Sequence, residues 1–282
     1  MKPTVKPTVI AETEKKESAM QNDIDGKRPI RFDAEALESP AERRKFLGKL
    51  ALAAGAVTIA PLIFRGRGIV ELLYAQQTGE TEPGLSDTDI LNYALTLEYL
   101  EATFYLRADN TGALPQGATI AAIDPDGNGE PGSVPGLAAV TPPAPATFSV
   151  PEFVRVVRDH EITHVLALQD ALGAMALDRA DFAFDFGAAF DSAAAFLATA
   201  QALEDTGVQA YLGQAGNIDD TAILGTAGSI LGVEAEHAST FRLINGETVT
   251  PNNADFDIPL SSAEVLAIAD DFITAAPALP FP

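Results

Sequence analysis

A duplicated pattern of acidic and histidine residues constrains the fold of this chain more than any other feature. The tetrapeptide Glu-x-x-His occurs at 161–164 and at 234–237, and it takes two of the three histidines in 282 residues. Glu and His three positions apart share one face of an α-helix, and apolar residues flank both motifs at helical spacing. A carboxylate and an imidazole without partners in an apolar core are costly. A bound dication would remove that cost, so the pattern predicts helices that hold metal.

A Glu and a Tyr recur with the same offset upstream of each motif. Glu98 precedes Tyr105 as Glu204 precedes Tyr211, and in both cases a Leu stands before the Glu and after the Tyr. The order along the chain is Glu, Glu-x-x-His, Glu, Glu-x-x-His, which indicates an internal duplication of a helix pair. The side chains that we expect to converge on one interior point are Glu98, Glu161, His164, Glu204, Glu234 and His237.

Hydrophobic periodicity predicts an all-α chain. We expect four long helices, and a shorter fifth, over residues 88–107, 150–177, 185–212, 220–244 and 261–274. Ser86 or Asp87 is suited to begin the first helix, and Gly246 to end the fourth. Ser261 with Glu264 fits a capping box at the start of the fifth.

This arrangement resembles the ferritin-like superfamily of di-iron and di-manganese carboxylate proteins, in which two helices each supply a Glu and two supply Glu-x-x-His. More narrowly, it resembles the exported ferritin-like-domain proteins, a group that includes desiccation-related proteins. The resemblance covers about residues 87–246 and implies a four-helix bundle. It also implies that the six residues above bind two iron or manganese ions, with zinc as a further candidate, and that Glu161 and Glu234 bridge the ions.

Four further residues lie close to the predicted ligands. Glu101, one turn from the first ligand, is an alternative to it, but the duplication disfavours this because Glu101 corresponds to Gly207. Tyr105 and Tyr211 either donate hydrogen bonds to ligand carboxylates or are core aromatic residues with a polar tip. His160 should face another direction than its neighbouring ligand, and we interpret it as a surface residue or as a group just outside the ligands.

A segment rich in Gly, Pro and Ala separates the first two predicted helices. A bundle with one long crossover has it between the second and third helices, so we interpret residues 109–149, the insert, as a decoration. It could serve as a lid or as a contact in a homo-oligomer. Within it, Asp124, Asp126 and Asn128 match the start of a calcium loop, although Pro135 stands where the acid at position 12 belongs. A calcium site and a plain Asp/Gly turn are the two alternatives.

Charge and composition exclude several classes of function. The net charge is −22, and from residue 76 onward the chain has five basic residues, all Arg, against 30 acidic ones. A surface this acidic repels phosphate backbones, so we expect no nucleic-acid partner. The absence of Cys excludes disulfides, thiolate nucleophiles and Cys-ligated iron–sulfur clusters.

The N-terminal part of the chain differs from the rest. Residues 1–42 are polar and charged without hydrophobic periodicity, which predicts disorder. In residues 43–75, the pair Arg43-Arg44, an aromatic residue and a short apolar run resemble a twin-arginine export signal, with a transmembrane anchor as the alternative. We therefore expect a ferritin-like domain over 76–282 that is exported to the periplasm or cell envelope, either free or anchored to the membrane.

A centre of two ions held by carboxylates and imidazoles suits redox chemistry with dioxygen or peroxide. The leading hypothesis is an exported protein that oxidises ferrous iron or consumes peroxide under oxidative or desiccation stress. Two alternatives stay open at this point. One is a non-catalytic structural or stress protein of the cell envelope that keeps the metal for stability, and the other is a manganese catalase.

Overall fold

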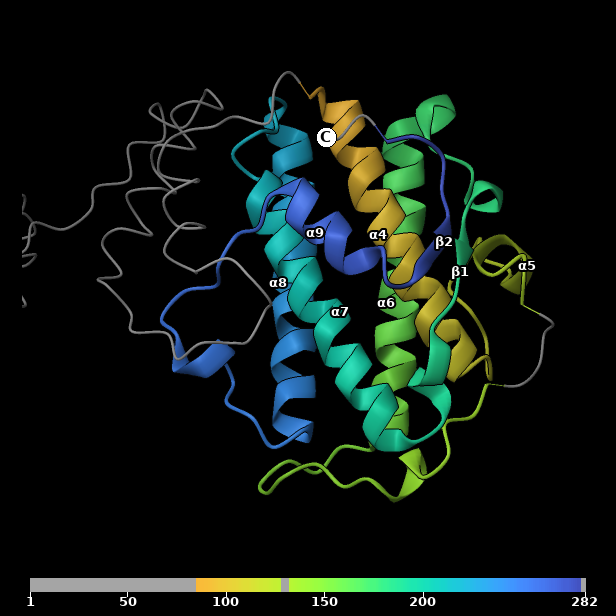
Figure 1. The fold of residues 1–282 in the computed structure, drawn as a ribbon, viewed down its shortest axis with the longest axis vertical. Helices are drawn as coiled ribbons and strands as arrows, with labels where there is room; N and C mark the ends of the chain where they lie inside the picture. Colours follow the sequence, from red (N-terminus) through yellow and green to blue (C-terminus); the bar gives the residue numbers. More distant parts are fainter. Residues whose placement is uncertain (1–84, 128–131, 280–282) are drawn as a thin grey trace, which may run out of the picture. The chain divides into compact units, whose positions relative to one another are not determined.

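The computed structural model describes residues 85–127 and 132–279, which form a four-helix bundle (Figure 1). The bundle helices are α4 (Asp87–Ala108), α6 (Val150–Leu172), α7 (Ala193–Gln214) and α8 (Thr221–Ile244). Helix α4 packs against α6, helix α7 packs against α8, and α4 also contacts α7. The all-α bundle predicted from the sequence is confirmed.

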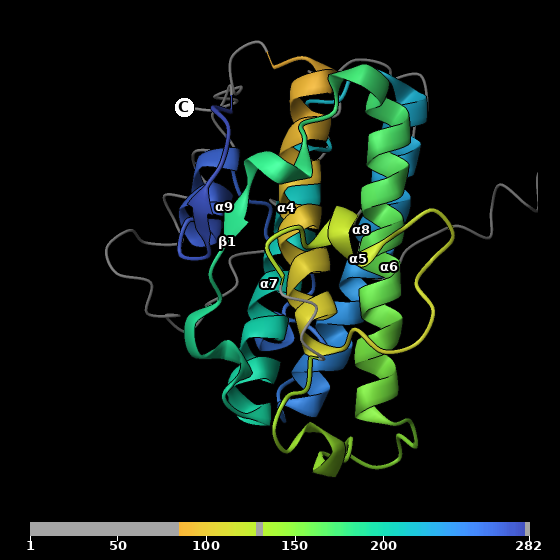
Figure 2. The same ribbon diagram turned by 90° about the vertical axis from the view of Figure 1, so that its right-hand side faces the viewer.

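The connection between the two helix pairs runs along the length of the bundle. Figures 1 and 2 show α6 and α7 pointing in the same direction, so residues 173–192 return from the end of α6 to the start of α7. This is the long crossover of a ferritin-like bundle. The insert joins the antiparallel helices α4 and α6 instead, and it contains the single-turn helix α5 (Ile120–Ile123) and a 3-10 turn at Leu137–Ala139.

Side-chain caps fix where the bundle helices begin. Ser86 accepts a hydrogen bond from the backbone N–H of Asp89, and the Asp89 carboxylate accepts one from the backbone of Ser86, which satisfies two N–H groups that the helix leaves unpaired. The corresponding caps of the other three helices are Ser149, Ser192 and Asp220. Helix α6 ends at Leu172 and not at the predicted residue 177, because Gly173 adopts a φ of 53°, which residues other than Gly rarely adopt.

A short antiparallel pairing changes two other predicted boundaries. Strand β1 (Ala183–Phe184) pairs with β2 (Ile273–Ala275). After β1 the chain forms a 3-10 turn at Gly187–Phe190, and helix α7 begins only at Ala193, behind its cap Ser192, and not at residue 185. The last helix, α9 (Ser262–Ala269), ends before the predicted residue 274. The pairing connects the crossover to the C-terminal segment, a contact that periodicity along the chain does not report.

Helix α4 is buried on every side, with all residues from 90 to 106 in the interior. The partner helices cover part of its surface, and the insert and the crossover cover the rest. Arg179 of the crossover, itself buried, donates hydrogen bonds to the Thr103 hydroxyl and to the carbonyl of Ile123 in the insert. A helix that is apolar around its whole circumference requires such a cover. Glu98 and Glu101 of α4 are buried as well, but on the side of the helix that faces the bundle interior.

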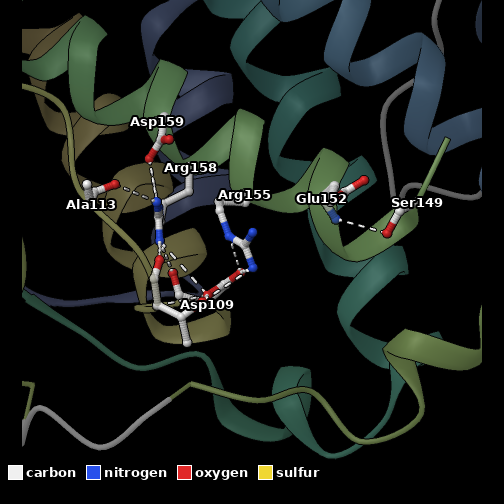
Figure 3. A network of polar contacts seen from close by, with 8 residues as sticks. Asp109, Ala113, Ser149, Glu152, Arg155, Arg158 and Asp159 are labelled. Carbon is white, nitrogen blue, oxygen red and sulfur yellow. Dashed lines mark hydrogen bonds and ion pairs between the residues drawn. The ribbon is translucent and has the colours of Figure 1, made fainter.

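Arg158 attaches the start of the insert to α6, as Figure 3 shows. Its side chain is fully buried and donates hydrogen bonds to the backbone carbonyls of Asp109, Thr111 and Ala113 at distances of 2.7–3.4 Å. It also forms an ion pair with Asp159. Since α6 carries the first Glu-x-x-His motif, Arg158 holds the insert on the helix that presents this motif.

Residues 1–84 lie outside the described part of the chain. The disordered region at 1–42 and the twin-arginine signal at 43–75 therefore stay predictions. Within the described ranges, no helix combines the length and the apolar character needed to cross a lipid bilayer.

Candidate metal centre

The six acidic and histidine side chains singled out in the sequence meet inside the bundle. Each of the six residues is at most 8% exposed, and together they offer two groups of four ligand atoms, with the atoms of each group within 4.8 Å of one another. The first group consists of Glu98, Glu161, His164 and Glu234, and the second of Glu161, Glu204, Glu234 and His237. Glu161 and Glu234 belong to both groups, which is the place of a carboxylate that bridges two ions.

The two imidazoles point the same nitrogen at the carboxylates. Nδ1 of His164 lies 3.0 Å from Glu161 Oε2, 3.2 Å from Glu234 Oε1 and 3.3 Å from Glu98 Oε2. Nδ1 of His237 lies 3.0 Å from both Glu161 Oε1 and Glu204 Oε2. Metal–ligand bonds of about 2.0–2.2 Å place two ligands at right angles about 3 Å apart. These separations are thus the ones expected between ligands of one cation.

Several carboxylate oxygens in the two groups have no hydrogen-bond donor. Oε2 of Glu98, Oε1 of Glu161 and both oxygens of Glu234 are buried and accept no well-formed hydrogen bond, because each imidazole has a single nitrogen to offer to several oxygens. Buried charges are found paired or bound to metal, because an uncompensated one is strongly destabilising. Two divalent cations would supply the missing partners, and a mixed set of carboxylate and imidazole ligands suits iron, manganese or zinc. The residues present therefore fit a pair of metal ions.

Two tyrosines cross between α4 and α7 to hold the outer carboxylates. Tyr105 donates a hydrogen bond to Oε1 of Glu204, and Tyr211 donates one to Oε1 of Glu98. In each case the other oxygen, Oε2, faces the imidazole of the same group. Each phenol thus fixes one carboxylate oxygen and leaves the other directed at the place where a cation would bind.

The comparison with known protein families agrees with this geometry. The model of the ferritin-like domain family matches residues 86–247, which is more than half of the chain. The chain belongs to this family. No curated protein matches it. The matched region of the ferritin-like domain runs from α4 to α8 and includes all six converging side chains, whereas α9 follows it.

Glu101 of the ferritin-like domain lies beside the two groups without joining either. It is 3% exposed, and burial together with the surrounding carboxylates raises its pKa well above the usual value. A Cβ atom built on Gly207, its counterpart in the duplication, would lie 2.7 Å from Glu234 Oε2 and 3.3 Å from Glu101 Oε1. The missing side chain at 207 therefore leaves room for both carboxylates. The first group contains Glu98 and not Glu101, in agreement with the duplication.

His160 lies beside one of the two converging histidines. Its Nδ1 lies 2.9 Å from Nε2 of His237, on the far side of that ring from the carboxylates. The His160 ring is exposed, whereas His237 is 3% exposed. Two features of the sequence could have indicated this place: His160 is the one histidine outside the Glu-x-x-His motifs, and it immediately precedes Glu161.

The weak calcium-loop candidate has a different role in the structure. Asp124 is buried, and its two carboxylate oxygens accept hydrogen bonds from Nε and Nη2 of Arg107 at 2.8 Å. Asp126 is exposed, and Asn128 lies outside the described residues. A calcium ion at the first position would have to displace a guanidinium, so the plain turn, with Asp124 as an arginine partner, is the better interpretation.

Without metal, the ferritin-like domain should lose stability as pH rises from 5 to 9. Burial raises the pKa of Glu98 to about 7, despite the opposing effect of His164. A carboxyl group whose pKa is raised by folding stabilises the fold below its unfolded pKa, and this contribution disappears as pH passes the folded value. Burial disfavours the charge of His237, but the Glu204 and Glu161 carboxylates outweigh it and raise its pKa to about 11. This contribution is present below about pH 6.5 and declines toward pH 11, in the same direction.

The measurement is the melting temperature of metal-free and manganese-loaded protein at several pH values in this window. Each proton held only by the folded state lowers the free energy of unfolding by at most about 1.4 kcal/mol for each unit of rising pH. In the loaded form cations replace these protons, so the stabilisation that manganese confers should grow with pH. Glu98→Gln should flatten the metal-free profile. A metal-free melting temperature that rises from pH 5 to 9 would contradict the assignment.

Proposed function

We propose that this chain is a di-metal oxidoreductase that holds two iron or manganese ions between the six converging side chains and oxidises ferrous iron or consumes peroxide. The observation that carries the proposal is the sharing of Glu161 and Glu234 by two adjacent ligand groups. A pair of ions held this closely can divide between them the electrons needed to reduce dioxygen or peroxide.

The chain's own residues prepare the site for this chemistry. The tyrosines at 105 and 211 fix the carboxylates of Glu204 and Glu98, so that these ligands keep their positions when the charge of the centre changes. Burial of all six side chains excludes bulk water, which strengthens the electrostatic interactions inside and limits side reactions. The carboxylates of the two groups are four in number and the imidazoles two, so the ligands supply enough negative charge to balance two divalent cations.

We further propose that the protein acts in the periplasm or cell envelope, after export through the twin-arginine route. This rests on the sequence of residues 43–75, and it fits a protein that must acquire its metal before it is translocated in the folded state. The test is a fusion of residues 1–84 to a reporter protein, with and without replacement of Arg43 and Arg44 by Lys. If the reporter stays in the cytosol in both cases, this part of the proposal is rejected.

The proposed activity is tested by anaerobic loading with ferrous iron, followed by air or peroxide. We expect a metal-dependent absorbance change that disappears in Glu161→Ala and Glu234→Ala. Glu236→Ala is the matched control, because Glu236 is an exposed carboxylate on the same helix between two of the ligands. Loaded protein that is stable and inert to both oxidants would support a structural role instead, and rapid oxygen release from peroxide by the manganese form would identify a catalase.

A further inference from the structure

The third histidine of the chain contacts one of the two ligand histidines. His160 on α6 and His237 on α8 lie with their ring centres 5.2 Å apart and their planes at 19°. The short contact joins Nδ1 of His160 to Nε2 of His237 at 2.9 Å. Because Nδ1 of His237 faces Glu161 and Glu204, the two nitrogens of His237 have different partners.

This arrangement determines where His237 carries its proton when it binds a cation. A cation among the second group would take the lone pair of Nδ1, so the ring proton then resides on Nε2 and is donated to His160. Ligand histidines commonly donate their other N–H to an acceptor, which fixes both the tautomer and the orientation of the ring. His160 offers that acceptor from an exposed position, and it is not a member of either ligand group.

His164, the imidazole of the first group, has no partner equivalent to His160 among the residues that the structure describes. His160 corresponds in the duplication to Val233, whose side chain neither donates nor accepts hydrogen bonds. His164 shows 10% of its side chain to solvent, and no side chain or backbone group among the described residues forms a hydrogen bond with its Nε2. The two groups therefore share the same kinds of ligands but differ in what supports their histidines.

We propose that His160 is a positioning residue that makes the second group the tighter of the two cation sites, so that this site fills first. The inference rests on the proposed function, because it assumes that both groups bind cations, but it does not require redox turnover. The two groups have the same kinds of ligand residues, three Glu and one His each, so the ligands alone give no reason for a difference in affinity.

The test uses the metal-free chain and cobalt(II), whose visible absorption reports binding without redox chemistry. Glu98→Gln removes a ligand of the first group only, and Glu204→Gln a ligand of the second only, so each background reports one site. Adding His160→Ala to Glu98→Gln should weaken cobalt binding about 10- to 100-fold. Adding it to Glu204→Gln should leave the affinity unchanged.

His160→Asn and Thr163→Ala separate positioning from a general effect on the helix. The Asn oxygen can replace Nδ1 as acceptor, so His160→Asn should restore most of the affinity and the cobalt spectrum. Thr163 is exposed on the same helix, and its hydroxyl donates to the Asp159 carbonyl, so Thr163→Ala should match the parent. Equal weakening of both sites, no effect of His160→Ala, or no rescue by Asn would overturn the inference. Loss of iron oxidation with the cobalt result intact would reject the proposed function alone.

Discussion

Replacing Glu234 by glutamine is expected to remove both metal ions, whereas replacing Glu98 or Glu204 removes one. Glu234 contributes to both ligand groups, and Glu98 and Glu204 to one each. An amide has a single weak ligand oxygen and cannot bridge two cations as a carboxylate does. Elemental analysis of the purified variants should therefore give about two ions for the parent, one for Glu98→Gln and Glu204→Gln, and none for Glu234→Gln, on the ligand counts usual for such sites.

The same substitution should stabilise the metal-free protein. Both oxygens of Glu234 are buried without hydrogen-bond donors, and burial together with the charge of Glu161 raises the pKa of Glu234 well above its usual value. A neutral amide relieves this repulsion and can donate to the neighbouring carboxylates, a gain of about 2 kcal/mol or about 5 °C in melting temperature. Glu236→Gln, which alters an exposed carboxylate of the same helix, should change neither quantity. Retention of one ion by Glu234→Gln would show that Glu234 is not shared by the two groups. A lower metal-free melting temperature would contradict the predicted relief of the buried charge.

Replacing Arg158 by alanine should cause a large loss of stability, although the residue lies outside the metal centre. The fully buried guanidinium is the common donor to three backbone carbonyls of the insert (Figure 3). Hydrogen bonds from charged donors are worth about 1.5–3 kcal/mol each, and buried acceptors left unpaired add to the cost. We expect a loss of about 4 kcal/mol, which corresponds to a fall of about 10 °C in melting temperature.

Arg155 on the same helix provides the matched control. Its side chain is 42% exposed and pairs with Asp109 at 3.0 Å, and exposed ion pairs contribute less than about 1 kcal/mol. Hydrogen exchange should show faster exchange at the start of the insert in Arg158→Ala and little change in Arg155→Ala. Equal effects of the two substitutions would mean that the insert is held elsewhere.

The bundle and the convergence of the six side chains could be predicted from the sequence because both depend on short-range patterns. The i, i+3 spacing puts Glu161 and His164 on one helix face, and the repeated Glu and Tyr offsets relate the two helix pairs before any contact is known. The start of the first helix was also accessible, because Ser86 and Asp87 are residues that begin helices by local hydrogen bonding.

The differences come from contacts between residues far apart in the chain. The start of α7 was predicted too early because residues up to 192 belong to the crossover, whose strand 183–184 pairs with 273–275, about 90 positions away. The contact between His160 and His237 depends on how α6 and α8 lie relative to each other, and helical periodicity contains no such information. Likewise, Arg107 takes Asp124 as its partner, which a loop motif read by itself cannot reveal.

The crossed tyrosines suggest what the duplication means for the architecture. Tyr105 and Tyr211 exchange equivalent bonds between the two halves, and each half contributes to both ligand groups. A single helical hairpin could therefore build the same interior by associating with an identical copy about a twofold axis. Fusing two hairpins in one chain removes the requirement that they be identical. The pairs Glu101/Gly207 and His160/Val233 are two of the positions at which the halves differ, and Glu101 and His160 both contact or adjoin the shared interior.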